Sequence, residues 1–497
     1  MICKTKIHFF SSFRALFTLL LAAFCLPLFA NNITISNTSL TNGSAADGYC
    51  FVTFDLSWEN SWRLSSAPSN WDAAWVFVKY RVGSGEWLPA NLHNTGHTAG
   101  TGTTADITVG LVDDNAAFDA STNPGIGVFV YRSSDGTGTF ASTGLKLRWD
   151  YRADGVADGA NVEVKVFTIE MVRVLEGAFN AGGGAGYGGF TSTTISTADA
   201  TTAPTGIGAL GGEAGGYPTG QTAPDNASWP NGYNAFYCMK YEGSQQQYVD
   251  FLNTLTQTQA DERKYTGSDS RYAITGSTVG GYATTLPNVA CNNLSSADAD
   301  AYADWSGLRP MTELEFEKAC RGPLLPVPGE YAWGTTDVAS SAYTLGDADT
   351  ANEGIATNYS TTAGNASHYA TGNTIDGPLR VGIFAANGSN SGRVSSGASY
   401  WGIMELSGSL WERPVMIINA AGRAFTGRHG DGLLASNGNA DVATWPSTNN
   451  VDEGWRGSAW NDPFSTYFMV VSDRYYADEN TAFIYRYNSS GFRAVRR

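Results

Sequence analysis

The positions of sulfur and imidazole groups limit the chemistry that this sequence could perform. Among the five histidines, His93 and His97 have the spacing of a metal-ligand pair, but they lie among Asn, Thr and Gly with no helix to align them. We therefore interpret them as loop residues. Four cysteines follow residue 30, and in an oxidising compartment they could form one or two disulfides whose pairing the sequence does not give. They are Cys50, Cys238, Cys291 and Cys320.

Other catalytic patterns are weak, and no P-loop, GxSxG or CxxC motif occurs. Residues 428–432, Arg-His-Gly-Asp-Gly, could form a polar site, but no nucleophile stands beside them, so we predict a turn. Residues 184–189 formally fit GxGxxG, yet no helical spacing follows them, and we predict a flexible surface loop. Asp347, Asp349 and Asn352 are oxygen-rich without an EF-hand match, and we interpret them as a solvated acidic loop.

Aromatic residues are concentrated at the end of the chain, where residues 455–497 hold 11 of them with arginines interleaved. Trp, Tyr and Arg contribute most to binding interfaces because they bury a large area and still offer hydrogen bonds or stacking. Some of these residues must instead form the core under the closing strands, and we assign Trp460, Phe492 and Arg493 to it. The candidate ligand-binding residues, for which a core position stays open, are Phe464, Tyr467, Phe468, Tyr475 and Tyr476.

Composition and charge restrict the class of protein. The chain has 497 residues, 42% of them hydrophobic, so large cores are expected, and its 58 glycines favour a β-rich, loop-rich build. Residues 1–30 carry three basic residues, an apolar run and a small residue at the end, which is the pattern of a secretory signal peptide. Without them the charge is 27 basic against 46 acidic residues. This balance disfavours nucleic acid and anionic membranes as partners. No later run is long enough to span a membrane, so we expect a secreted or cell-surface protein.

Short alternating strands dominate the first part of the mature chain. Runs such as Leu145, Leu147 and Trp149, which alternate with polar residues, predict strands with one dry face, and turn residues separate them. We therefore predict an Ig-like β-sandwich over residues 31–165. The apolar parity then changes between Val166 and Phe167, which predicts a bulge or a change of sheet and places the domain boundary there.

Three helices can be placed in the remaining segment, residues 166–497. Each begins at a capping box, with Ser244, Ser295 or Thr312 three residues before Gln, Asp or Glu. Long irregular stretches surround these helices, so the fold class is β-rich α+β.

The second segment resembles the formylglycine-generating enzyme family, also called sulfatase-modifying factors. Residues 307–317, GLRPMTELEFE, are similar to its "G-x-R-L-P-T-E-x-E-W-E" motif, and residues 408–412 are similar to its "G-N-V-W-E-W" motif. Residues 236–242 resemble the strand before its first helix, and residues 456–460 with 491–493 resemble its "R-G-G-S-W … G-F-R". The resemblance covers about two thirds of the chain and implies one compact domain with a C-type-lectin-like variant fold.

The resemblance also implies which site residues to look for. Enzymes of the family hold copper with two thiolates shortly after "R-G-G-S-W", but the corresponding positions here are about Asp462 and Tyr467, and no cysteine follows Cys320. Since copper(I) selects soft sulfur ligands, we expect no copper and no formylglycine chemistry. The family's disulfide positions correspond to Ala303 and Ala494, so that bridge is absent too.

A structural calcium ion is the cofactor that the resemblance leaves open. The matching ligands would be the side chains of Glu405 and Glu412 and the carbonyls of Gly408 and Leu410. The alternative is that Glu412 pairs with an arginine.

The sequence thus favours a recognition protein on a catalytically silent domain, binding a protein or glycan through the C-terminal aromatic and arginine residues. In family members diversified by retroelements the same stretch displays the ligand-binding residues. Two alternatives stay open. The protein could be a filament or adhesin subunit that anchors or self-associates through the sandwich, or an enzyme of the family with different chemistry.

Overall fold

Most of the chain after residue 31 has a described structure. The computed structural model describes residues 32–184, 186–201, 224, 226–418, 420–446, 453–477 and 485–497. The predicted signal peptide, residues 1–30, lies outside them. Within the described ranges, no helix is both long and apolar enough to cross a membrane.

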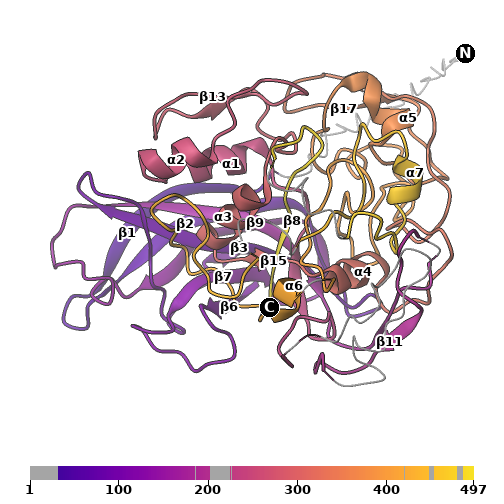
Figure 1. Ribbon diagram of the computed structural model, residues 1–497. Helices are drawn as coiled ribbons and strands as arrows, with labels where there is room; N and C mark the ends of the chain where they lie inside the picture. The colour runs from indigo at the N-terminus through magenta and orange to yellow at the C-terminus, as the bar shows by residue number, and fades with distance from the viewer. Residues whose placement is uncertain are drawn as a thin grey trace, which may run out of the picture.

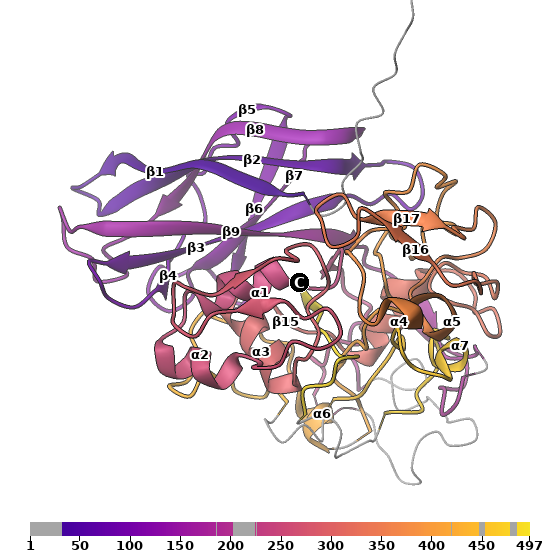
Figure 2. The same ribbon diagram turned by 90° about the horizontal axis from the view of Figure 1, so that it is seen from above.

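Two antiparallel sheets pack face to face in the first part of the chain (Figure 2). One sheet has the order β1-β2-β8-β5, with β1 Thr34–Ser44, β2 Tyr49–Arg63, β8 Gly136–Trp149 and β5 Thr101–Gly102. The facing strands are β9 Val162–Val174, β3 Asp72–Val82, β7 Gly125–Arg132 and β6 Ala105–Leu111, with β4 Leu88–Pro89 beside β3. Alternate residues of β2 point inward, so Phe54 and Trp58 share a dry core with Val76 and Val78 of β3. This is the β-rich architecture that the alternating strands predict.

Strand β9 crosses the predicted boundary without interruption. It pairs with β3 from Val162 opposite Val82 to Val172 opposite Asp72, with no register shift. The expectation of a bulge or a change of sheet at residue 166 is therefore wrong. Val164 and Val166 pack against the sandwich core. Ile169 and Met171 point to the other face and pack against the part of the protein that follows β9, which we call the second half. The apolar parity changes because the buried face of the strand changes along its length.

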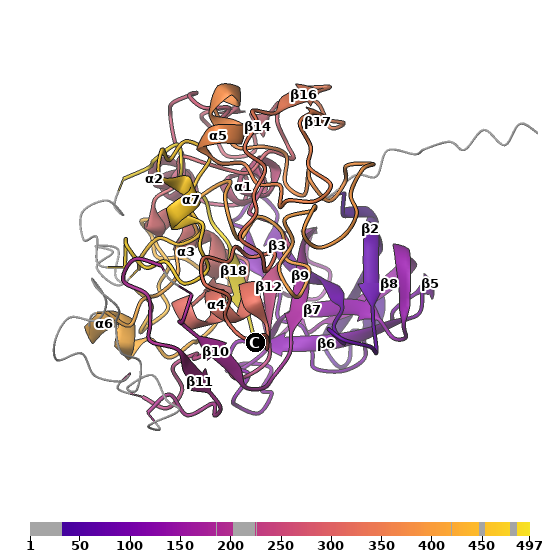
Figure 3. The same cartoon turned by 90° about the vertical axis from the view of Figure 1, so that its right-hand side faces the viewer.

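The sheet continues from β9 into the second half of the chain (Figure 3). Its further strands, in spatial order, are β12 Phe236–Met239, β18 Ala494–Arg496 and β15 Arg309–Pro310. Helices α1 Gln245–Leu252 and α3 Ser296–Trp305 cover the face opposite the sandwich, where Trp305 meets Phe77 with ring centroids 5.0 Å apart. One sheet thus serves two cores.

The three predicted helices are present and begin at the predicted capping boxes. Ser244, Ser295 and Thr312 are the N-caps of α1, α3 and α4 Glu313–Arg321. Thr256 caps a fourth helix, α2 Gln257–Arg263, in the same way, and the sequence analysis missed it. The other helical segments are short: α5 Tyr369–Gly372, η2 Asn373–Ile375, α6 Ala420–Ala424 and α7 Ser465–Phe468.

Loops and two-stranded ribbons make up the rest (Figure 1). The ribbons pair β10 Phe179–Ala181 with β11 Thr193–Ile195, β13 Ile274–Thr275 with β14 Ala283–Thr284, and β16 Thr344–Gly346 with β17 Gly354–Thr357. All four cysteines of the described residues are free thiols. Ala303 and Ala494, where the family has a disulfide, are buried in one hydrophobic cluster.

Candidate functional site

Helix α4 presents two buried acids to the interior. Its N-cap is closed reciprocally: the Glu315 amide donates to the Thr312 hydroxyl, and the Thr312 amide donates to the Glu315 carboxylate. Glu313 and Glu317 are four residues apart, so they lie on one face of the helix, and both are fully buried. Buried carboxylates require ionic or hydrogen-bonding partners, and these partners come from segments distant in sequence.

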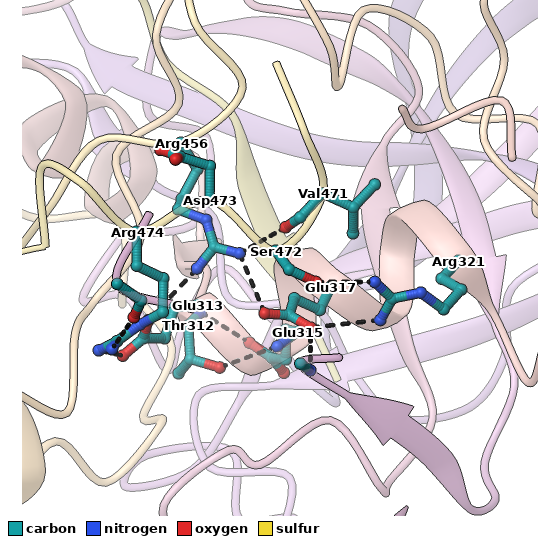
Figure 4. A network of polar contacts seen from close by, with 12 residues as sticks. Thr312, Glu313, Glu315, Glu317, Arg321, Arg456, Val471, Ser472, Asp473 and Arg474 are labelled. Carbon is teal, nitrogen blue, oxygen red and sulfur yellow. Dashed lines mark hydrogen bonds and ion pairs between the residues drawn. The ribbon is translucent and has the colours of Figure 1, made fainter. Parts of the chain in front are cut away.

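Two arginines bind these acids (Figure 4). Arg456 Nη1 lies 3.3 Å from Glu313 Oε2, and its Nη2 lies 3.1 Å from Glu317 Oε1. Arg474 donates from Nε and Nη2 to the two oxygens of Glu313 at 2.6 and 3.1 Å, which is the bidentate geometry that makes arginine pairs strong. A third arginine, Arg321, pairs with Glu317 at 3.3 Å and with Glu330.

These arginines also hold the backbone beyond helix α7. Arg456 Nη2 donates to the Val471 carbonyl at 2.6 Å, and Arg321 Nη2 donates to the Ser472 hydroxyl at 2.9 Å. Asp473 accepts from the Tyr475 amide at 3.2 Å. Residues 471–475 are thereby fixed on helix α4.

Residues 186–189 are docked on the same segment, which the prediction of a flexible surface loop missed. The Arg474 amide donates to the Tyr187 carbonyl at 2.7 Å, and the Tyr187 amide donates to Asp473 Oδ2 at 3.0 Å. Glycine is required for this approach, because a Cβ at Gly186 would lie 2.5 Å from the backbone of Asp473. The side chain of Arg474 adds a hydrogen bond to the Gly188 carbonyl at 3.1 Å.

An aromatic surface lies over this frame. We define it as Tyr187, Phe464, Tyr467 and Tyr475, whose exposed fractions are 58%, 60%, 60% and 53%. Tyr187 and Tyr475 have ring centroids 5.9 Å apart at an interplanar angle of 82°. Large rings with more than half of their area exposed are characteristic of binding surfaces when they cluster.

Buried rings support the exposed ones. Phe468 lies 5.2 Å from Tyr475 and 6.3 Å from Phe464. It belongs to one buried cluster with Trp411 and Trp455, whose rings stack at 5.5 Å. Phe464 and Tyr475 therefore rest on a packed layer, and Tyr187 packs against Tyr475.

The predicted ligand-binding residues divide between these two layers. Phe464, Tyr467 and Tyr475 are exposed, Phe468 is buried, and Tyr476 is half-buried against the Trp411 ring. Phe468 is therefore a core residue, the position that the sequence analysis had left open for it. Tyr187 was missed, and its only signal was a large aromatic residue in a run of glycines.

The residues predicted to bind calcium are engaged in other contacts. Arg493 Nε donates to Glu412 Oε1 at 2.6 Å, and both side chains are buried. Glu405 accepts from the Gly382 amide at 2.7 Å. Leu410 presents its amide to Glu242 at 2.8 Å.

The carboxyls in this region have raised pKa values because they are buried near one another. Burial raises the pKa of Glu405 to about 7, and burial with repulsion from Glu412 raises the pKa of Glu242 well above its usual value. Glu412 thus forms the arginine pair that the sequence left open as the alternative, while Glu405 Oε2 is buried without a hydrogen-bond partner among the described residues. The calcium ion stays a prediction.

The positions that match the copper ligands of the family carry no thiol. The two positions are Asp462 and Tyr467, and neither side chain contains sulfur. Asp462 accepts from the Phe464 amide at 2.8 Å, and Tyr467 is exposed. Burial raises the pKa of Cys238 to about 12 and raises those of Cys291 and Cys320 well above the usual value. Without a bound metal, these thiols stay protonated at neutral pH.

The other polar groups singled out in the sequence have local roles. His97 Nε2 lies 2.7 Å from the His93 carbonyl, so the two rings do not converge on a metal. Arg271 pairs with Asp349 at 3.0 Å, so the predicted acidic loop is partly neutralised. Three further carboxylates, of Asp304, Asp431 and Asp441, have oxygens within 4.8 Å of one another. Both oxygens of Asp304 accept backbone amides of the other two residues.

Comparison with known proteins identifies the family of the larger, C-terminal part of the chain. The profile described as "Sulfatase-modifying factor enzyme 1-like domain" matches residues 168–497, about two thirds of the chain. Among curated proteins, no match is found. Because the profile covers well over half of the sequence, the protein belongs to the sulfatase-modifying factor family, as its four ordered motifs suggest.

Proposed function

We propose that this protein is a secreted or cell-surface recognition protein that binds a protein or glycan through the aromatic surface. The observation that supports this most is the pairing of exposed rings with a rigid base: Phe464, Tyr467, Tyr475 and Tyr187 lie over a buried aromatic layer and a network of buried ion pairs.

A rigid base favours binding because it lowers the entropy lost on association. Side chains and loops that become ordered at an interface reduce its affinity. Here the Ser472 hydroxyl and the Val471 carbonyl are already bound by arginines before any ligand arrives. Tyrosine and phenylalanine on such a base are the residue types expected at the centre of an interface.

The domain is proposed to be catalytically silent toward formylglycine formation. The last 177 residues contain no cysteine, and the described thiols are protonated by burial. We expect the C-type-lectin-like variant fold to serve as a display scaffold and the Ig-like sandwich to attach the protein to its surroundings.

Glycan and protein arrays probed with two matched variants test the proposal. Phe464→Ser, Tyr467→Ser and Tyr475→Ser combined remove exposed rings of the surface. Leu40→Ser, Val82→Ser and Leu88→Ser combined remove exposed apolar groups of the sandwich. Ligands of the wild type should be lost by the first variant and kept by the second. Binding that survives the first variant would contradict the proposed surface.

Catalytic silence has a separate test. The purified protein is loaded with copper and offered a cysteine-containing peptide of the kind that formylglycine-generating enzymes oxidise. We expect no aldehyde by mass spectrometry. Turnover would show that the domain is an active enzyme despite its missing thiolates.

A further inference from the structure

A cavity of about 270 Å³ lies at the junction of the two halves of the protein, and no residue of the aromatic surface lines it. The turn after β6, residues 112–115, forms one wall. Residues 227–235 of the second half and the predicted turn around His429 form the others. The Arg497 side chain lies at the rim and donates to the Asn115 side chain at 2.7 Å.

Two buried pairs form the floor of this cavity. His429 Nε2 lies 3.0 Å from Asp114 Oδ2, which links the second half to the sandwich. Arg309 donates to both oxygens of Glu315 at 2.6 and 2.8 Å. His429 is 4% exposed and Arg309 is 3% exposed, so both side chains are more than nine-tenths buried.

Three polar atoms of these pairs have no hydrogen-bond partner among the described residues: His429 Nδ1, Asp114 Oδ2 and Arg309 Nε. Burial lowers the pKa of His429 to about 4, so the ring is neutral at pH 7. Nε2 faces Asp114 Oδ2, and a neutral ring that carries its proton on this nitrogen leaves Nδ1 as an acceptor. A buried donor and a buried acceptor without partners are costly unless a ligand or water satisfies them.

The wall beside Arg309 is kept free of a side chain by Gly427. A Cβ at this position would lie 2.5 Å from Pro230 Cγ and 3.8 Å from Arg309 Nε. The backbone also has a φ of +71° there, which favours glycine. The approach to the unpartnered Nε therefore stays open.

The charges that line the cavity nearly cancel. Three arginines, Arg309, Arg428 and Arg497, face four carboxylates, Asp113, Asp114, Asp199 and Glu315. Neither a strong anion nor a strong cation is favoured by such a lining. Planar amide, carboxylate and guanidinium groups can each bind two neighbouring hydroxyls, and a hydroxyl can both donate and accept a hydrogen bond.

We propose that this cavity binds a neutral, hydroxyl-rich ligand of monosaccharide size. The volume lies just below the range of pockets for drug-sized ligands, which limits the occupant to a small molecule. The inference is independent of the proposed function, because it uses none of the aromatic residues.

Saturation-transfer NMR and calorimetry on the purified protein test this assignment. The probes are glucose, galactose, mannose and N-acetylglucosamine, with glucuronate and inorganic phosphate as charged comparisons, at up to about 10 mM. At least one neutral sugar should bind more tightly than either anion. Failure of all four neutral sugars, or a preference for glucuronate or phosphate, would overturn the proposal.

Variants then locate the bound sugar. Ser228→Trp places a large side chain at the exposed rim and should abolish binding, whereas Ser36→Trp on β1, a matched exposed serine, should leave it unchanged. Arg428→Ala adds no bulk and should weaken binding about tenfold, the equivalent of one good hydrogen bond. Equal thermal unfolding midpoints check that the variants fold.

Two results would show that the cavity is not the site. One is full affinity in both Ser228→Trp and Arg428→Ala. The other is loss of sugar binding in the combined Phe464, Tyr467 and Tyr475 variant, which would place the sugar on the aromatic surface instead.

Discussion

At the scale of single residues, buried charge pairs determine where functional side chains lie. Glu313 has no exposed area, yet it is held by Arg456 and Arg474, which come from segments more than 140 positions away. An acid in this position is stable only while both guanidiniums are present. The position of Tyr475 therefore depends on a carboxylate that does not touch it.

Glu313→Gln should be strongly destabilising because it leaves two buried arginines without their shared counter-ion. We expect a loss of about 3–5 kcal/mol in the free energy of unfolding, measured by urea denaturation. The matched control is Glu163→Gln, which breaks an exposed pair with Arg81 and should cost no more than about 1 kcal/mol. Equal losses in the two variants would contradict this account.

His429 should make the stability depend on pH below neutrality. Its pKa is lowered by burial from 6.5 to about 4, so between these values the unfolded chain binds a proton that the folded chain does not. Stability should fall as the pH drops from 6.5 toward 4, by up to about 1.4 kcal/mol per pH unit, and this effect should be absent above 6.5.

The variant His429→Gln isolates this contribution. Its unfolding free energy should fall less steeply than that of the wild type between pH 6.5 and 4, and the two slopes should agree between pH 7 and 8. Parallel slopes throughout the acid range would mean that His429 takes up its proton in the folded protein.

At the scale of elements, the sequence predicts what local interactions decide. The capping boxes at Ser244, Ser295 and Thr312 each mark a helix start, because the cap is formed within four residues. The predictions for strand β9 and for residues 184–189 were wrong because local interactions do not decide the structure there. Their environment is set by partners distant in sequence, such as α3 for Ile169 and Asp473 for Gly186.

Gly186→Ala tests whether this close approach holds the aromatic surface together. The new Cβ would meet the Asp473 backbone at 2.5 Å and should push residues 186–188 away from residues 473–475. We expect faster amide hydrogen exchange at Tyr187 and Arg474, whose hydrogen bonds join the two segments. Gly388→Ala is the control, since a Cβ there meets nothing within 4 Å. Unchanged exchange in Gly186→Ala would show that the contact is not rigid.

At the scale of the whole molecule, the family and the β-rich class follow from the sequence, but the union of the two halves does not. The motifs around Thr312 and Arg456 identify the domain because they are contiguous in sequence. The functional surface is assembled from Tyr187 and residues 464–475, and only three-dimensional contacts join them. Likewise, no sequence pattern indicates that His429 would meet Asp114 across the junction.

The contacts between the sandwich and the second half should make the protein unfold as one unit. Strand β9 belongs to both cores, and Lys240 lies 3.2 Å from Asp72 and 3.0 Å from Glu170 in a fully buried cluster. Asn70 and Trp75 of the sandwich donate side-chain hydrogen bonds to backbone carbonyls of the second half at 2.7 and 2.8 Å. Neither half can unfold without leaving these groups buried and unpaired in the other.

Calorimetry should therefore give a single endotherm whose calorimetric and van 't Hoff enthalpies agree. Circular dichroism, which follows the strands, and tryptophan fluorescence should report the same midpoint. Two separate transitions would mean that β9 stays folded with one half while the other melts, and the shared sheet would then act as a platform for two independent cores.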